Sequence, residues 1–295
     1  MTPANLIRLY RKPRRRTNLV PYPVVIILLA AGALFAQEMP TRTIRDLSLH
    51  ELRATLKGYP GDWRPDTDRE KGRSEPLREK VISAGAVRIK LPAPDAATIG
   101  TVSLSDALKQ RRSRRSFTGE ALTSTDLGFL LWSSQGVTSK ADEEGERSFR
   151  TAPSAGGRYP LETYVLALNV DGIPRGIHRY LPDSHELVTV REDENLPREM
   201  ITICYGNTFV GDAAAIVVWA AVPERTEWKY GYLSPRMIAM EAGHACQNLY
   251  LACEAVGAGA CAMLSYDQVR LDALLGVDGE NEFAIYLAVV GKVVR

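Results

Sequence analysis

The sequence predicts one large domain of mixed α and β structure, and three observations support this prediction. Apolar residues alternate over 164–170, which is typical of a strand. A second apolar run at 214–222 has the length and composition of a buried strand. The longest apolar segment runs from Ser234 to Gly257, which is the length of a long helix. Helices and strands are therefore expected in the same domain.

The first two helices are marked by their capping residues. Ser103 can cap a helix that continues through Arg112. The segment 123–126 is a capping pattern, apolar leucines follow it at helical spacing, and Gly136 stands where this second helix would end. Two helices are thus predicted before the first long strand.

The remaining elements include one hairpin and the long helix. The arms of the hairpin are expected at 177–180 and 187–190, joined by a Pro-Asp-Ser turn. Ser234 is expected to cap the long helix, with Pro235 in its first turn. Because this helix is apolar on nearly every face, we expect it to be central. A short strand, a helix at 266–275 and a last strand at 283–290 complete the domain.

Composition indicates a folded, mildly acidic domain with a basic N-terminal tail. The chain has 295 residues, of which 45% are hydrophobic, and a formal charge of +2. Residues 1–36 hold six basic side chains and no acidic ones, so the rest of the chain has 31 basic and 35 acidic side chains. Outside the tail there is no basic stripe with interleaved aromatic residues, so no nucleic-acid partner is expected.

Residues 1–36 predict a signal peptide or a membrane anchor. An uncharged apolar run at 24–36 follows the basic cluster. Two prolines interrupt the extension of this run toward residue 19, so a cleaved signal and a membrane-spanning helix both remain open. The arginines are expected to stay in the cytoplasm, which makes the protein membrane-anchored or exported and places the later residues outside the cytoplasm, in the periplasm.

Residues 37–95 predict a linker or a wrapping arm, and residues 96–295 predict the functional domain. The arm is rich in charge, proline and glycine. The four cysteines of the chain have no CxxC spacing, so we expect buried free thiols and no metal site.

One further pattern resembles a metal motif. Glu241 and His244 form an E-x-x-H pair, which di-iron bundles use in two copies. The chain has no second copy. We therefore interpret Glu241, His244 and Asn248 as a hydrogen-bonded polar stripe on the long helix, inside a dimer core.

Two segments have the chemistry of a site for a flat ligand that carries a phosphate. Residues 111–117 have the sequence Arg-Arg-Ser-Arg-Arg-Ser-Phe, whose guanidinium and hydroxyl groups suit a phosphate. Residues 151–162 combine two prolines with the small residues Ser-Ala-Gly-Gly at 154–157, so this backbone can approach a flat ligand closely. A helix end alone would explain the basic residues through the helix dipole. The pairing of the two segments instead predicts anion neutralisation beside a planar ring.

At these motifs the chain resembles the nitroreductase superfamily, and more closely its SagB-type branch of flavin-dependent dehydrogenases, which includes azoline oxidases. The resemblance covers residues 88–292 and implies an α+β fold, with a mixed β-sheet flanked by helices and a long central buried helix in a homodimer. The motifs that carry it occur in order at 111–117, 130–136, 152–162, 229–231, 241–249 and 290–292.

The resemblance also implies which residues bind FMN. The phosphate and ribityl chain would be held by Arg111, Arg112, Ser113 and Arg115, with Lys292 as a further phosphate candidate. The edge of the flavin ring would be lined by Pro153, Ser154, Ala155, Gly156 and Gly157, often across a dimer interface. Leu264 and Ser265 stand near flavin N5, where relatives favour Gly-Ala, so a narrower pocket is expected.

Lys229 and Tyr230 correspond to the Lys-Tyr pair that azoline-oxidising relatives use beside the flavin. Dehydrogenation removes a proton from carbon while hydride leaves for N5, so a base is needed near that carbon. Lys229 would be this base, and Tyr230 would orient the substrate or relay the proton. The alternative interpretation of the same residues is a surface turn before the long helix.

The sequence therefore predicts an FMN-dependent oxidoreductase that transfers hydride between N5 and an unknown small-molecule or peptide-derived substrate. Residues 232–235 depart from the family's pattern, which leaves the substrate open. One alternative is an NAD(P)H-dependent nitro or quinone reductase, which an extracytoplasmic position would disfavour. Another is a flavin-binding sensor or sequestering protein without turnover.

Overall fold

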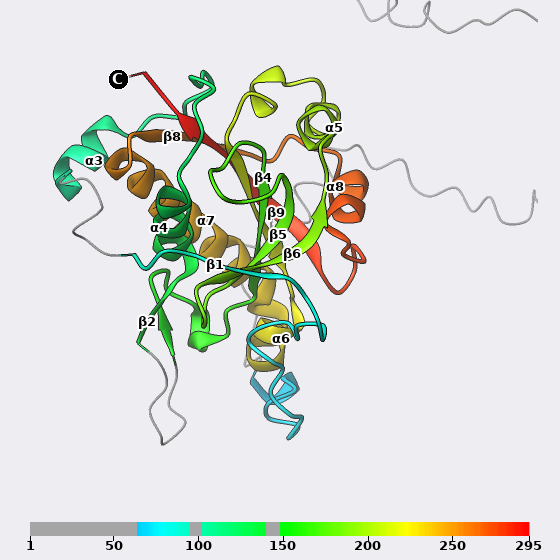
Figure 1. Cartoon of the computed structure of the whole chain (residues 1–295). Helices are drawn as coiled ribbons and strands as arrows, with labels where there is room; N and C mark the ends of the chain where they lie inside the picture. Colours follow the sequence, from blue (N-terminus) through cyan, green and yellow to red (C-terminus); the bar gives the residue numbers. More distant parts are fainter. Residues whose placement is uncertain (1–63, 95–101, 140–147, 295) are drawn as a thin grey trace, which may run out of the picture. The chain divides into compact units, whose positions relative to one another are not determined.

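The main sheet of the domain has seven strands, and each neighbouring pair is antiparallel. The computed structural model describes residues 64–94, 102–139 and 148–294. The strand order is β1-β6-β5-β4-β7-β9-β8 (Figure 1). The strands of this sheet are β1 Arg88–Lys90, β4 Leu161–Ala167, β5 Gly176–Leu181, β6 Glu186–Glu192, β7 Ala215–Ala221, β8 Ala258–Met263 and β9 Phe283–Lys292. A separate ribbon pairs β2 Val137–Ser139 with β3 Phe149–Arg150.

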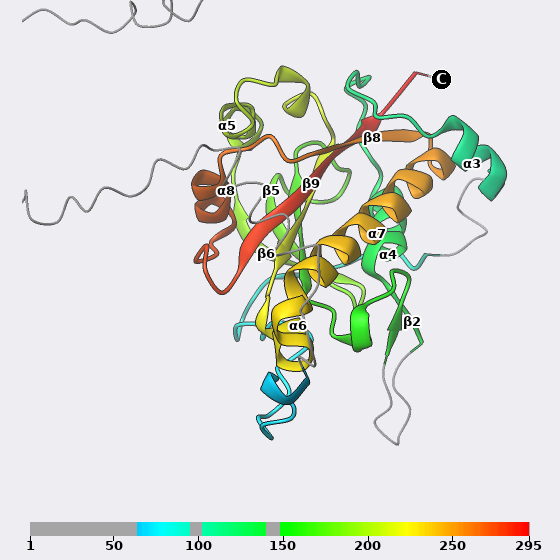
Figure 2. The same cartoon turned by 180° about the vertical axis from the view of Figure 1, so that it is seen from behind.

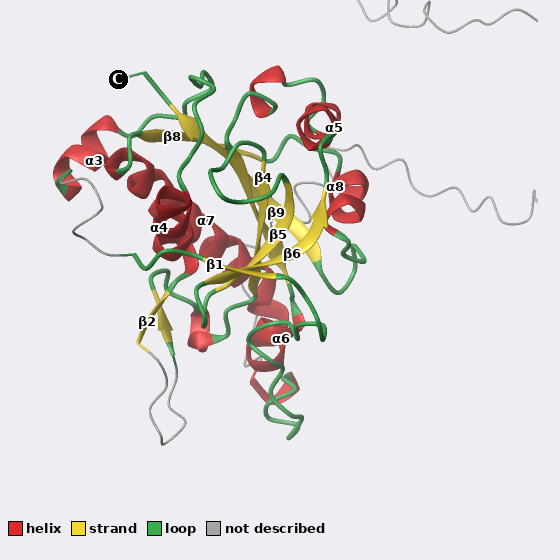
Figure 3. Ribbon diagram, viewed as in Figure 1, coloured by secondary structure: helices red, strands yellow, loops and turns green. Residues whose placement is uncertain are grey.

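Helices cover both faces of this sheet. Their bounds are α3 Leu104–Gln110, α4 Ser124–Gln135, α5 Leu196–Ile203, α6 Glu224–Tyr230, α7 Ser234–Ala255 and α8 Gln268–Leu275. Seen from both sides, α4 and α7 lie along one face, and α5 and α8 lie against the other (Figures 1 and 2). The ribbon coloured by secondary structure shows the same three layers (Figure 3). The predicted sheet flanked by helices is therefore confirmed, with antiparallel strands throughout the described sheet.

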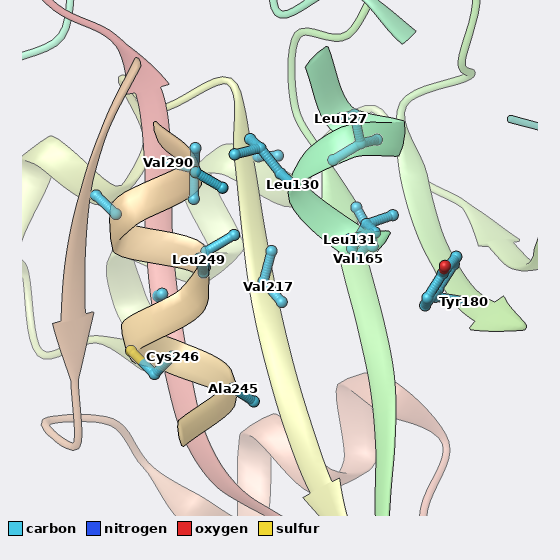
Figure 4. Packing of buried hydrophobic residues seen from close by; sticks show 14 of the residues in the cluster. Leu127, Leu130, Leu131, Val165, Tyr180, Val217, Ala245, Cys246, Leu249 and Val290 are labelled. Atoms are coloured by element: carbon cyan, nitrogen blue, oxygen red, sulfur yellow. The ribbon is translucent and has the colours of Figure 1, made fainter. Parts of the chain in front are cut away.

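The central strands are buried on both faces, because alternate residues point to different helix layers. On β7, Val217 and Trp219 pack in the core under α4 and α7, whereas Ile216 and Val218 pack in the core under α5 and α8. Leu249 of α7 and the leucines of α4 meet Val217 in the first of these cores (Figure 4). The long helix is thus packed on the sheet, as predicted, but it is not surrounded by protein in the protomer.

The predicted helix starts at 103 and 123 are confirmed. Ser103 Oγ accepts a hydrogen bond from Asp106 N, and α3 ends at Gln110, two residues before the predicted end. Thr123 and Asp126 form a reciprocal capping box at the start of α4. The predicted hairpin is present as β5 and β6, and the buried free cysteines are confirmed.

Other expectations were wrong or incomplete. Ser234 does not cap α7, because the helix begins at Ser234 itself and the preceding Leu233 takes the capping position without a side-chain hydrogen bond. Helix α6 was not predicted, since its Trp-Lys-Tyr end has the composition of a surface turn. Strand β1 was assigned to the arm, although it pairs with β6 at the edge of the sheet.

The predicted signal peptide or anchor at 1–36 lies outside the described residues, as does most of the arm. Within the ranges that the structure describes, no helix combines the length and the apolar character needed to cross a bilayer. Those ranges also contain no group of three metal-binding side chains.

Candidate functional site

The arginine-rich segment lies along the free edge of β8. Ser113 forms a parallel bridge with Ala260, and Arg114 N donates a hydrogen bond of 2.8 Å to Ala260 O. A Cβ atom on Gly259 would lie 2.5 Å from the Arg114 side chain, so a residue without a side chain is needed at that position for this close approach. Exposed Arg112 and Arg115 remain available to an anion on this edge.

Tyr250 joins this segment to α7 and β8, and the sequence did not point to it. Its hydroxyl accepts a hydrogen bond of 2.7 Å from Ala262 N and lies 3.1 Å from Ser113 Oγ. The Arg111 guanidinium lies over the Tyr250 ring, 5.3 Å from its centre. The buried Tyr250 side chain thus holds two of the predicted phosphate-binding residues, Arg111 and Ser113, in place.

Lys292 has protein partners in this structure. Its Nζ donates to Val256 O at 2.8 Å, at the end of α7, and lies 2.9 Å from Asp126 Oδ2, at the start of α4. These contacts join two helix ends to the last strand, while the phosphate role of Lys292 stays a prediction.

The small-residue bend has the backbone conformation that its glycines allow. Gly156 and Gly157 have φ values of 62° and 63°, in the region that residues with a Cβ atom rarely adopt. Ser154 Oγ accepts a hydrogen bond of 2.9 Å from Tyr159 N and closes the bend. We call residues 153–157 the glycine bend.

The glycine bend and the Lys-Tyr pair meet in one protomer. Helix α6 ends at Tyr230, and Gly231, with φ 47°, takes the chain away from it. A Cβ atom on Gly156 would lie 2.5 Å from Tyr230 Oη and 2.8 Å from Lys229 Nζ, so both side chains pack directly on the glycine backbone. The structure thus places Lys229 and Tyr230 at the end of a helix, against a predicted flavin-binding segment.

A buried ion network holds α6 beside the glycine bend. The Glu162 carboxylate, 3% exposed, accepts a hydrogen bond of 3.0 Å from Arg179 Nη1 and pairs with Arg225 of α6. Arg158, directly after the bend, donates to Arg225 O at 2.7 Å, and its guanidinium lies 4.9 Å from the centre of the Trp228 ring. Burial alone would raise the pKa of Glu162, but the charges of Arg225 and Arg179 outweigh it and lower that pKa.

The described part of the arm also holds α6. Arg69 N donates to Trp228 O at 2.8 Å, and Trp228 Nε1 donates to Arg73 O at 2.8 Å. Lys80 N donates to the Glu162 carboxylate at 2.9 Å. Residues 64–80 therefore fix the helix that ends with the Lys-Tyr pair.

Two residues of the predicted polar stripe contact the glycine bend or the chain just before it from α7. Asn248 Nδ2 donates to Thr151 O at 3.3 Å, and the Ser154 hydroxyl lies beside the Glu241 carboxyl and lowers its pKa. Glu241 is 3% exposed, and its Oε1 has no partner within the described residues. His244 points elsewhere, on the exposed face of α7.

Glu241 predicts a pH-dependent stability. Burial raises its pKa from 4.5 to about 7, while the Ser154 hydroxyl and the charges of Arg150 and Arg225 act in the opposite direction. The folded protein therefore binds this proton more tightly than the unfolded chain, and stability falls as the pH rises from 4.5 through 7. A Glu241→Gln variant should lose this trend. Its free energy of unfolding should therefore rise by about 3 kcal/mol relative to that of the wild type between pH 4.5 and pH 8. Urea unfolding across this range measures it, and parallel curves for the two proteins would contradict it.

A cavity of about 450 Å³ lies where β8 ends. Leu264, which is 70% exposed, lines it together with Ala242 and Gly243 of α7 and Ile285 and Tyr286 of β9. Ser265 is exposed beside it. The chain from Ala260 to Leu264 therefore leads from the arginine-rich segment to an apolar cavity next to the predicted N5 loop.

One protomer does not bring the arginine-rich segment and the glycine bend together. Ser113 contacts α7 at Tyr250, and Ser154 contacts it at Glu241. Glu241 and Tyr250 are nine positions apart, which corresponds to two and a half helical turns. The two contacts therefore lie on opposite sides of α7 and about 13 Å apart along it. The two predicted halves of the flavin site are therefore separate within a single chain.

Comparison with known proteins identifies relatives of this chain. A model of the nitroreductase family matches residues 108–292. A protein assigned as a nitroreductase from Methanocaldococcus jannaschii is 33% identical over 194 residues, which cover 66% of this chain and 93% of the relative.

Solved structures share the fold. A protein assigned as a nitroreductase from Ralstonia eutropha is 29% identical with a TM-score of 0.59, over 75% of this chain and 97% of that chain. A protein of the same assignment from Anabaena variabilis is 25% identical with a TM-score of 0.59, over 72% of this chain, which spans 42% of that protein's length. One chain of the E. coli microcin synthetase McbBCD complex, solved with truncated pro-MccB17, has the same fold at 17% identity and a TM-score of 0.53, over 84% of this chain and 92% of that chain. On the family match and the 33% identical relative, this chain belongs to the nitroreductase family and is an FMN-dependent oxidoreductase.

Proposed function

We propose that this protein is a homodimeric dehydrogenase of the SagB-type branch, which oxidises a small-molecule or peptide-derived substrate. The observation that carries the proposal is the packing of Lys229 and Tyr230 on Gly156. This contact places a potential base and a phenol beside the backbone that the resemblance assigns to the flavin ring. A reductase that only passes hydride from a nicotinamide to the flavin has no need of a base there.

The exposed face of α7 supports the dimer. Ala239, Met240, Gly243, His244 and Gln247 form this face, and Met240 is 56% exposed. On the helix it lies between the side that contacts the glycine bend and the side that contacts the arginine-rich segment. Two-fold packing of this face on a second copy would bring one protomer's bend opposite its partner's arginine-rich segment. A flavin site shared between two protomers would be built from these two half-sites, one from each chain, and their separation within a single chain is consistent with this arrangement.

The residues present fit FMN. Arg111, Arg112, Ser113 and Arg115 would hold the phosphate, and the buried Arg114 Nε, which has no partner within the described residues, is a further donor on this edge. The ring would lie toward Leu264 and the apolar cavity, where a flat apolar group can be desolvated. When bound, FMN supplies an acceptor for hydride at N5. Lys229 would take the substrate proton, and Tyr230 would hold the substrate against the glycine bend.

A second function has support from the relatives. The two solved nitroreductases and the archaeal relative carry names that suit an NAD(P)H-dependent nitro or quinone reductase. Anaerobic bleaching of the purified yellow protein separates the two functions. Bleaching by a thiazoline-containing peptide supports the dehydrogenase, whereas bleaching by NADH or NADPH alone supports the reductase.

We also propose that residues 1–36 export or anchor the domain. The basic cluster followed by an uncharged apolar run supports this proposal. Alkaline phosphatase fused after residue 36 should be active, and an inactive fusion beside an active cytoplasmic reporter would contradict it.

Arg115→Ala should weaken FMN binding about 10- to 100-fold, because charge-assisted hydrogen bonds of about 1.5–3 kcal/mol are lost. Arg115 is exposed on the β8 edge and its charge acts on the Cys261 thiol beside it. Flavin fluorescence during titration of the apoprotein gives the dissociation constant. Arg198→Ala on α5, across the sheet, is the control and should bind FMN as wild type does. Equal affinity of the two variants would remove Arg115 from the phosphate site.

A further inference from the structure

Two hollows adjoin each other beside α6 and the start of α7. The first is the apolar cavity of about 450 Å³ at Leu264, and the second has a volume of about 420 Å³. Glu227, Ser234 and Pro235 line both of them. The two hollows therefore share one wall, and we call this adjoining pair the passage.

The far end of this passage is acidic. Asp66, Asp68 and Glu227 line the second hollow, and no lysine, arginine or histidine lines either hollow. Asp68 pairs with Arg73 at 3.1 Å, and Lys71 Nζ donates to the backbone oxygen of Asp66. Within the described residues, the carboxylates of Asp66 and Glu227 have no ion-pair partner, so the passage keeps a negative charge.

Ser234 gives independent evidence of a ligand in this passage. The residue is 1% exposed, and its Oγ has no hydrogen-bond partner within the described residues. A buried hydroxyl without a partner costs about 1–3 kcal/mol, so natural proteins normally supply one. Ser234 stands in the wall that both hollows share, so a small outward shift of this wall would let a polar group of a bound ligand reach the hydroxyl, which is covered in this structure.

We infer that the passage binds a substrate with an apolar body and a cationic end group, such as a protonated amine or a guanidinium. This inference rests on the proposed function, because it takes the flavin ring to lie toward Leu264. The apolar body would occupy the first hollow, and the cation would reach the carboxylates of Glu227 and Asp66. Glu227 stands two residues before Lys229 on α6, so the group that selects the substrate and the proposed base belong to one short helix.

Three ligands with one apolar body test the inference. 4-Phenylbutylamine, 4-phenylbutanol and 4-phenylbutyrate carry a positive, a neutral and a negative end group at pH 7. Calorimetric titration of the FMN-loaded protein should give a dissociation constant for the amine that is at least about 10-fold below that of the butyrate, with the alcohol between them. Half-molar salt should reduce this difference.

Glu227→Gln should remove most of the preference for the amine and leave the affinity for the alcohol unchanged. Glu224→Gln is the matched control, because Glu224 lies on the same helix but lines neither of these hollows. It should change the preference less than about twofold. A yellow protein that binds the three ligands equally, or a Glu227→Gln variant that keeps the preference, would overturn the inference alone. A protein that takes up no FMN would overturn the proposed function and this inference with it.

Discussion

The Glu162→Gln variant is expected to lose about 3–5 kcal/mol of folding free energy, which is the usual cost of removing one partner from a buried ion pair. Glu162 is 3% exposed, and the guanidinium groups of Arg179 and Arg225 are also buried. An amide in this position cannot neutralise the two positive charges. Its NH₂ group would also face donors, since Arg179, Arg225 and Lys80 N all donate to the carboxylate.

Loss of the Glu162 carboxylate should disturb the candidate site as well as destabilise the fold. Arg225 belongs to α6, and its carbonyl accepts the hydrogen bond from Arg158, which follows the glycine bend. When Glu162 no longer holds Arg225, the helix that carries the Lys-Tyr pair loses its main buried anchor. Denaturation should therefore begin at lower urea concentration, and FMN should be released early in the transition.

Urea unfolding followed by tryptophan fluorescence measures this effect. Glu194→Gln is the control, because the Glu194 side chain is 82% exposed in its pair with Arg175 and such pairs contribute about 0–1 kcal/mol. If Glu162→Gln loses less than about 1 kcal/mol, the ion network does not hold α6 in place.

The ion pairs of Glu162 could not be predicted from the sequence. Glu162 belongs to the motif that identifies the family, yet its partners Arg179 and Arg225 lie 17 and 63 residues away and carry no local signal. The capping residues of α3 and α4 were predictable because a cap acts within one turn. Helix α6 was not, since its seven residues are held by the ion network and by the arm rather than by an apolar stripe.

The arrangement of the proposed flavin site was predictable only in part, for a different reason. Each half-site is local in sequence, so the arginine-rich segment and the glycine bend could both be found from their composition. Their relation depends on α7, which puts their contacts on opposite sides of one helix. Tyr250 was missed because a tyrosine on an apolar helix has the pattern of a core residue, and only the fold brings it to Ser113.

The Lys229→Ala variant is expected to stay yellow and to lose about 10²- to 10⁴-fold of its rate with a substrate that must give up a proton from carbon, which is the usual contribution of a positioned base. The side chain packs on Gly156 and its ammonium lies 5.5 Å from the centre of the Tyr230 ring. Loss of the ammonium leaves the proposed phosphate-binding segment beside β8 untouched, so FMN affinity should stay within about twofold.

Two reductants decide whether Lys229 acts as a base. A thiazoline-containing peptide must lose both a proton and a hydride, whereas dithionite reduces flavin without a base. Anaerobic stopped-flow bleaching should therefore be slowed with the peptide and unchanged with dithionite, and Lys90→Ala on β1 should behave as wild type with both. A similar loss with both reductants would make Lys229 a structural residue. Full activity of the yellow Lys229→Ala protein with the peptide would instead assign the proton to another group, for which Tyr230, in contact with the same glycine, is the first candidate.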